Sequence, residues 1–156
     1  MDQDKVDFLK QQFVPLLRQL PSDTLPHWGK MSLQQMVEHF ADAVRLASGK
    51  IQLTEMVTPE ELVPKYQAFL MSDKPFRENT INPMLPEVPP PVRNKTIEGA
   101  LDELQRELDL FFSVFETNHQ ERTRNPIYGD LDFNQNVLLL YKHALHHLRQ
   151  FGLTVS

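Results

Sequence analysis

The stretch KHALHHLRQ, residues 142–150, places three of the six histidines of the chain within five consecutive positions of a strongly helical segment. His143 and His147 are four residues apart, so they lie one above the other on one helical face and can both reach a single ion or substrate. His146 points to a different face of the helix. Two ligands do not complete a metal site, so another part of the chain has to supply a third.

A projection of this segment at about 100° per residue separates its histidines. His143 and His147 fall along one border of the apolar stripe, whereas His146 falls on the polar face with Lys142. Gln150 projects toward the two border histidines, so it is the residue expected to hydrogen-bond to a metal-ligating histidine. Stripe borders are positions where side chains from facing helices converge in a helical bundle.

The third histidine comes from a second amphipathic helix. Ser32 followed by Gln35 is a capping box that predicts the start of this helix, and Gly49 is its expected end. His39 lies at the border of its apolar stripe, on the same face as Gln35, whereas Glu38 falls on the solvated side of the helix. We therefore expect His39 to meet the two border histidines of residues 142–150.

Other boundaries follow from caps and prolines. The apolar periodicity predicts a first helix over residues 3–19, which Pro15 should kink or shorten. Pro59 begins a short helix that Pro64 should kink or split. Thr96 can cap a third long helix. The expected apolar stripe of that third long helix consists of Ile97, Leu101, Leu104, Leu108, Phe111, Phe112 and Phe115.

The fourth long helix is also well delimited. A capping box of Asp132 with Gln135 precedes it, Gly152 ends it, and residues 125–129 form a turn before it. Four long amphipathic helices, with no alternating strand pattern and no internal repeat, predict an all-α bundle. The length is that of one domain, residues 1–156.

A proline-rich segment separates the second and third long helices. Residues 73–94 contain six of the twelve prolines and are predicted to be mostly extended loop. A loop this long in a compact domain usually covers something or is partly disordered. We expect it to wrap over the domain, because it carries apolar side chains that can anchor it, namely Phe76, Ile81, Met84, Leu85 and Val88.

Composition excludes several classes of protein. The hydrophobic share of 40% and the charged share of 24% are those of an ordinary globular protein, without an apolar run for a membrane span. The formal charge of −5 argues against a nucleic-acid partner. The acidic N-terminus lacks the features of a secretory signal, so a cytoplasmic location is expected. The absence of cysteine excludes disulfides, thiolate metal sites and a nucleophilic thiol.

His39, His143 and His147 could form a facial site for a divalent metal, because imidazole suits zinc, nickel, copper and iron. Water or substrate would fill the open positions, and a three-histidine zinc centre lowers the pKa of bound water to about 7. The alternative is that these imidazoles only hydrogen-bond to neighbours. Glu103 and Glu107 are either a solvated flank of the third long helix or carboxylates near the metal.

The remaining histidines are expected outside the site. His27 and His119 occupy loop or helix-end positions and are structural or solvent-exposed, and His146 is a surface residue. Trp28 and Tyr128 are candidates to line the mouth of the pocket. No catalytic side chain is assigned.

The chain combines a histidine on the second long helix with a His-x-x-x-His pair on the fourth long helix. The segments concerned, together with the turn before the fourth helix, are WGKMSLQQMVEH (residues 28–39), NPIYG (residues 125–129) and KHALHHLRQFG (residues 142–152). In this combination the chain resembles the DinB/YfiT-like superfamily of metal-dependent proteins, and more narrowly an uncharacterised-domain branch of it. The resemblance covers nearly the whole chain. It implies a four-helix bundle with up-down-down-up connectivity, in which the proline-rich segment is the long crossover between helices two and three.

The resemblance also carries functional expectations. The metal ligands of the family would fall on His39, His143 and His147. Better-understood relatives are thiol S-transferases that use thiols such as bacillithiol or mycothiol, and maleylpyruvate isomerase. We therefore expect a divalent metal cofactor (zinc, nickel or iron) and a thiol S-transferase or hydrolase activity on a small-molecule or thiol substrate. The alternative is a non-catalytic helical bundle that binds a partner or forms a homodimer, with a structural metal or none.

Overall fold

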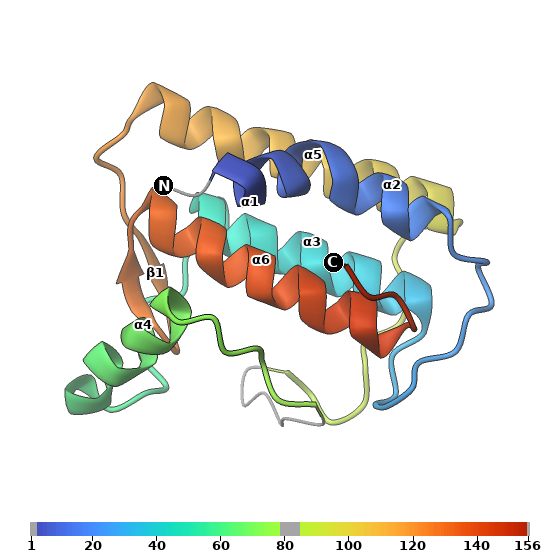
Figure 1. The fold of residues 1–156 in the computed structure, drawn as a ribbon, viewed down its shortest axis with the longest axis horizontal. Coiled ribbons are helices and arrows are strands. Elements are labelled where there is room, and N and C mark those ends of the chain that lie inside the picture. The colour runs from blue at the N-terminus through green and yellow to red at the C-terminus, as the bar shows by residue number, and fades with distance from the viewer. Residues whose placement is uncertain (1–2, 79–84, 156) are drawn as a thin grey trace.

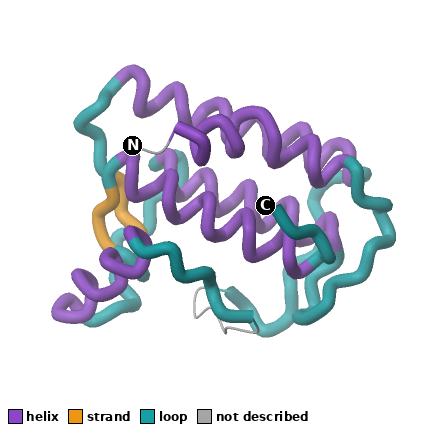
Figure 2. Tube along the Cα trace, in the orientation of Figure 1, coloured by secondary structure: helices purple, strands orange, loops and turns teal. Residues whose placement is uncertain are grey.

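The computed structural model describes residues 3–78 and 85–155 and is mostly helical (Figure 1, Figure 2). In chain order the elements are α1 Gln3–Asp7, the π-helical turn η1 Phe8–Gln12, α2 Phe13–Arg18, α3 Leu33–Ser48, the 3₁₀ turn η2 Glu60–Leu62, α4 Val63–Met71, α5 Ile97–Thr117, β1 Thr123–Asn125, β2 Gly129–Leu131 and α6 Phe133–Gln150. The predicted helical class is confirmed. Within the described ranges, no helix combines the length and the apolar character needed to cross a membrane.

Local side-chain chemistry sets the boundaries of the helices that matter for the site. The Ser32 hydroxyl accepts from the backbone N–H of Gln35, and the Gln35 side chain accepts from the backbone N–H of Ser32, which begins α3. Gly49 ends α3 with a φ of 83°, a left-handed conformation that favours glycine. Asp132 and Gln135 make the same reciprocal bonds at the start of α6. These predicted boundaries are confirmed.

The prolines produce irregular helices, as predicted. Pro15 has no backbone N–H, so the carbonyl of Gln11 four residues earlier lacks a helical donor. In the turn η1 just before, the backbone N–H of Phe13 bonds to the carbonyl of Phe8, the five-residue spacing of a π turn. The short helix around Pro64 is divided into η2 and α4.

The helices α3 and α5 pack against each other and run in the same direction. Glu38 in α3 bonds to Asn94 just before α5, whereas Lys50 just after α3 bonds to Glu107 inside α5. Figure 1 shows α6 running the opposite way along α3. The apolar core lies between these helices and the N-terminal helical segment, and its largest fully buried side chains include Phe13, Phe40, Phe111, Leu9 and Leu104.

The connection between α3 and α5 spans the molecule and includes the proline-rich crossover. Residues 72–78 and 85–96 contain no helix or strand, as predicted for this segment. Of the expected apolar anchors, Phe76 is half-buried and stacks on Phe69 with ring centroids 5.8 Å apart. The prediction for the anchors Leu85 and Val88 was wrong, since they are 36% and 71% exposed. The two other expected anchors, Ile81 and Met84, lie outside the described residues.

Polar contacts hold the end of this crossover instead. The carboxylate of Glu38, which was predicted to face solvent, is 4% exposed and accepts from the backbone N–H groups of Arg93 and Asn94 over 2.7 and 3.1 Å. Lys142 was likewise predicted on a polar face and is 8% exposed. A projection of one helix contains no information on the segments that cover it, which is the reason for both errors.

A small antiparallel hairpin precedes α6 and was not predicted. Strand β1 pairs with β2 in the register Thr123 with Leu131 and Asn125 with Gly129. In the turn, Asn125 Oδ1 accepts from the backbone N–H groups of Ile127 and Tyr128. The expected turn is therefore present, but the strands around it are three residues long, too short for a recognisable alternation.

Candidate metal centre

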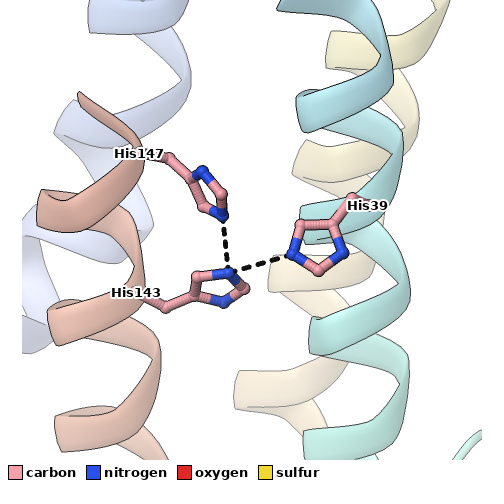
Figure 3. A group of neighbouring side chains, drawn as sticks. All are labelled: His39, His143 and His147. Atoms are coloured by element: carbon pink, nitrogen blue, oxygen red, sulfur yellow. Dashed lines mark hydrogen bonds between the residues drawn. The ribbon is translucent and has the colours of Figure 1, made fainter. Parts of the chain in front are cut away.

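Three imidazoles meet between α3 and α6. His39 projects from the middle of α3, and His143 and His147 project from successive turns of α6 (Figure 3). The Nε2 atom of His143 lies 3.1 Å from Nε2 of His39 and 2.7 Å from Nε2 of His147. In the part of the chain that the structure describes, these three form the one cluster of side chains able to hold a metal ion, with one nitrogen from each within 4.8 Å of the others. The histidines selected from the sequence are thus brought together; we call them the triad.

Burial keeps the imidazoles of the triad neutral. It lowers the pKa of His39 to about 4, although the charge of Asp42 acts in the opposite direction. Burial, followed by the neighbouring imidazoles, holds the pKa values of His143 and His147 well below the ordinary range. A neutral imidazole offers a lone pair to a metal without first losing a proton near pH 7.

Gln150 determines the tautomer of His147. Its Nε2 donates to the carbonyl of Trp28 over 2.9 Å, so its Oε1 faces Nδ1 of His147 at 2.7 Å. An amide oxygen can only accept, so Nδ1 carries the proton and Nε2 keeps its lone pair. The expected contact between Gln150 and a histidine of the pair is present, and it turns the lone pair of His147 toward the other two rings.

The contacts among the three Nε2 atoms are poorly satisfied as hydrogen bonds. Because Nε2 of His147 has no proton, the 2.7 Å contact requires His143 to donate. The same single proton then has to serve the lone pair of Nε2 of His39 at 3.1 Å as well, or, if Nε2 of His39 is itself protonated, two N–H groups face each other there. A cation among the three nitrogens removes this conflict, because each can then offer its electron pair.

Aromatic side chains hold the ring of His143 in place. Phe40 stacks on it with ring centroids 4.7 Å apart, and Phe76 from the crossover lies 6.3 Å from it. The sequence carried no signal for this stacking, since the contact joins two helices. His147 is 4% exposed, whereas His39 and His143 are partly exposed as whole residues.

Neither interpretation of Glu103 and Glu107 was correct. Glu107 is 4% exposed and accepts from Lys50 over 2.7 Å, and Glu103 pairs with Arg45 and Arg93 over 2.8 and 2.9 Å. Burial raises the pKa of Glu103, but the two guanidinium groups outweigh it and bring the pKa to about 2. These carboxylates join α3 and the crossover to α5 rather than facing solvent or a metal.

His146 is not the surface residue that was predicted. Its ring packs against Trp28 and Phe76 at centroid distances of 5.5 and 5.9 Å. Burial lowers its pKa to about 4, and its Nδ1 is buried without a hydrogen-bond partner among the described residues. The crossover and the loop that carries Trp28 cover this face of α6. Trp28 therefore contacts His146, the residue just before His147 in the sequence.

The other predicted positions lie farther away. The Tyr128 ring packs on the Tyr66 ring of α4, with 6.2 Å between the ring centroids. Tyr128 belongs to the turn between β1 and β2, and this hairpin adjoins the start of α6 (Figure 1). The triad lies in the second half of α6, so Tyr128 is not beside it. His27 and His119 are exposed, as predicted, and the backbone N–H of His27 donates to the carbonyl of Gln150.

Comparisons with known proteins add no relative on which the site can be mapped. No family model matches the chain, and neither a curated protein nor a solved structure matches it. We therefore infer a metal centre from the geometry of the triad itself.

Proposed function

We propose that this protein binds a divalent metal ion, of the zinc, nickel or iron type, through His39, His143 and His147. The observation that carries the proposal is the convergence of three neutral imidazoles whose Nε2 contacts share one proton. Nitrogen ligands of this kind suit these metals. The bond from Nδ1 of His147 to Gln150 adds support, because metal-ligating histidines usually donate their second N–H to an oxygen acceptor.

We further propose that the chain is a DinB-like four-helix bundle. The N-terminal helical segment runs antiparallel to α5, since Lys10 pairs with Glu116 and Arg18 pairs with Asp102. Together with parallel α3 and α5 and the opposite direction of α6, this supports the up-down-down-up connectivity that the sequence resemblance implies. The long crossover between α3 and α5 supports the same proposal.

The chemistry proposed for this centre is thiol S-transfer or hydrolysis on a small molecule. A bound divalent metal would supply Lewis acidity at the positions that three histidines leave open. The chain has no cysteine, so the nucleophile has to be water or the thiol of an external substrate. His39 and His143 are partly exposed, which gives such a molecule a side from which to approach.

Metal analysis of protein purified without a histidine tag tests the binding step. Wild-type protein is expected to carry about one metal ion per chain, the number that a single three-histidine cluster can hold. His143→Ala is expected to lose most of it. His119→Ala removes an exposed histidine outside the triad and should keep the metal. Equal metal content in wild type and His143→Ala would contradict the proposal.

Cobalt-substituted protein tests the chemistry, because its visible spectrum reports the ligands. Adding a small thiol is expected to produce a sulfur-to-cobalt charge-transfer band that His143→Ala lacks. A spectrum insensitive to thiol and to anions such as azide would mean a closed coordination shell. That result would favour the non-catalytic helical bundle over the enzyme.

A further inference from the structure

We propose that a cavity between α1, α6 and the chain segment after α4 binds a small organic anion with an apolar body. The cavity has a volume of about 360 Å³, inside the range of about 300–1,000 Å³ typical of small-molecule sites. No member of the triad lines it, so the inference is independent of the metal centre.

Positive charge dominates the walls of this cavity. It is lined by four basic side chains and by one carboxylate, that of Asp73. The basic side chains are Lys5, Lys74, Lys142 and Arg149. The whole chain carries a formal charge of −5, so this concentration of cations runs against the overall composition. A cleft with one sign of charge and low-dielectric walls concentrates ligands of the opposite sign.

Lys142 shows most directly why an anion would be favoured. Its side chain is buried, and its Nζ donates to the carbonyl oxygens of Ser72 and Lys74 over 2.6 and 2.5 Å. An ammonium group has three donors, and neutral carbonyls do not compensate its charge. Among the described residues no carboxylate lies within ion-pair distance of it, and Asp73 acts only from farther away. The ammonium group also lies over the Phe69 ring, 4.9 Å from the ring centroid, a contact that brings no negative charge. An anion in the cavity would supply that charge.

The remaining walls are apolar. Leu70 is fully buried, and Leu138, Tyr141 and Leu145 are half-buried and line the same cavity. An inorganic ion would leave these side chains against water, whereas a hydrocarbon or aromatic body would cover them. The chemical class that fits is a carboxylate or phosphate monoester with a short apolar body.

A second cavity lacks this imbalance. It has a volume of about 500 Å³ and is lined by the aromatic side chains of Phe112, Phe115 and Phe133. Its one lysine, Lys10, pairs with Glu116 over 3.4 Å, and a second carboxylate, Asp132, also lines it, so this cavity has no excess of Lys and Arg over Asp and Glu. We therefore assign the anion to the cavity at Lys142.

Titration of ¹⁵N-labelled protein, followed by NMR, tests the proposal. Octanoate and octyl phosphate are the probes, and octanol and octylamine are matched controls without the negative charge. Both anions are expected to bind with a Kd between about 10 μM and 1 mM, at least about tenfold more tightly than the controls. The shifts should centre on the cavity lining, which comprises residues 70–74 and, on α6, Leu138, Tyr141, Lys142, Leu145 and Arg149. Octanol binding as tightly as octanoate, or shifts centred elsewhere, would overturn the proposal.

Charge-removing variants localise the ligand. Arg149→Gln and Lys142→Met are expected to weaken octanoate binding by about fivefold or more, whereas Arg106→Gln, on the exposed face of α5, should not change it. Lys142→Met also removes the hydrogen bond to the carbonyl of Ser72, so a loss of binding in this variant could have a structural cause. Arg149→Gln is therefore the decisive variant, with its folding checked by circular dichroism. An unchanged octanoate affinity in Arg149→Gln would refute the site.

A triad variant separates this cavity from the metal centre. His143→Ala should keep the octanoate affinity of wild type, since no triad residue lines the cavity. Loss of octanoate binding in His143→Ala would place the anion at the triad and overturn the proposal. Loss of metal with retained octanoate binding would support both sites separately.

Discussion

The side-chain amide of Gln150 links the triad to the loop that precedes α3. In Gln150→Ala, Nδ1 of His147 loses its acceptor, so the imidazole can take the other tautomer and can rotate. We expect metal affinity to fall by about 10- to 100-fold, the usual effect of removing a partner of a ligating histidine. Competition for the metal against a chromophoric chelator measures the change.

A conservative variant distinguishes orientation from general loss of structure. Gln150→Glu keeps an acceptor for Nδ1 of His147 but cannot donate to the carbonyl of Trp28. Its metal affinity should therefore lie between those of wild type and Gln150→Ala. Gln19→Ala, an exposed glutamine at the end of α2, serves as the matched control. Wild-type affinity in Gln150→Ala would show that another contact sets the tautomer.

Sequence periodicity was sufficient to select the triad, because an i, i+4 pair and a histidine on a stripe border are properties of single helices. It was not sufficient to assign burial. Glu38, Lys142 and His146 were placed on polar faces, yet residues 72–76 and residues 93–94 lie over them. These contacts join parts of the chain far apart in sequence, so no pattern within one helix reports them.

The capping box of α6 matters for the site, because α6 supplies two of the three proposed ligands. Asp132→Ala removes the acceptor for the backbone N–H of Gln135 at the start of the helix. We expect the free energy of unfolding of the metal-free protein to fall by about 0.5–2 kcal/mol. Urea unfolding followed by circular dichroism measures it, with Asp23→Ala in an exposed loop as control. An equal loss in both variants would mean that the cap does not stabilise α6.

At the level of elements, the sequence was most informative where a single residue type determines the backbone. Ser32 and Asp132 cap their helices and Gly49 ends α3, all as expected from local chemistry. An irregularity was also expected at Pro15, but its form, a π turn just before the proline, was not. The hairpin β1–β2 escaped prediction because its strands are short. The expected anchoring of the crossover at Val88 failed because backbone contacts to a buried carboxylate hold the segment instead.

A metal at the triad would connect two helices that are distant in sequence, since His39 and His143 are 104 residues apart. A ligand that binds only the folded chain stabilises it by about 4 kcal/mol at a free concentration 1,000 times its Kd. We therefore expect added zinc to raise the Tm of metal-free wild type and to leave that of His39→Ala nearly unchanged. Differential scanning calorimetry with chelator-treated samples measures both. An equal rise in the variant would place the stabilising ion elsewhere.

Stability in acid is expected to decline in two separate pH ranges. Burial lowers the pKa of His39 to about 4 from the ordinary value of 6.5, so the unfolded chain binds more protons than the folded one between these values. The free energy of unfolding of the metal-free protein therefore falls as the pH drops from about 6.5 toward 4. Glu103 acts at lower pH, because its pKa falls from the ordinary 4.5 to about 2 against Arg93 and Arg45. Its stabilisation is present above about 4.5 and is lost as the pH approaches 2.

The variant Glu103→Gln separates these two ranges. It removes the group that titrates below pH 4.5 while leaving the triad intact, so the decline from pH 6.5 to 4 should persist and the loss below pH 4.5 should become smaller. At pH 7 the variant should be less stable by about 1–3 kcal/mol, reduced from the full linkage value because Arg93 is partly exposed to solvent. Urea unfolding of chelator-treated protein at a series of pH values measures both effects. An unchanged slope below pH 4.5 in Glu103→Gln would show that other carboxylates control acid unfolding, and that the ion pairs of Glu103 do not hold the crossover against α5.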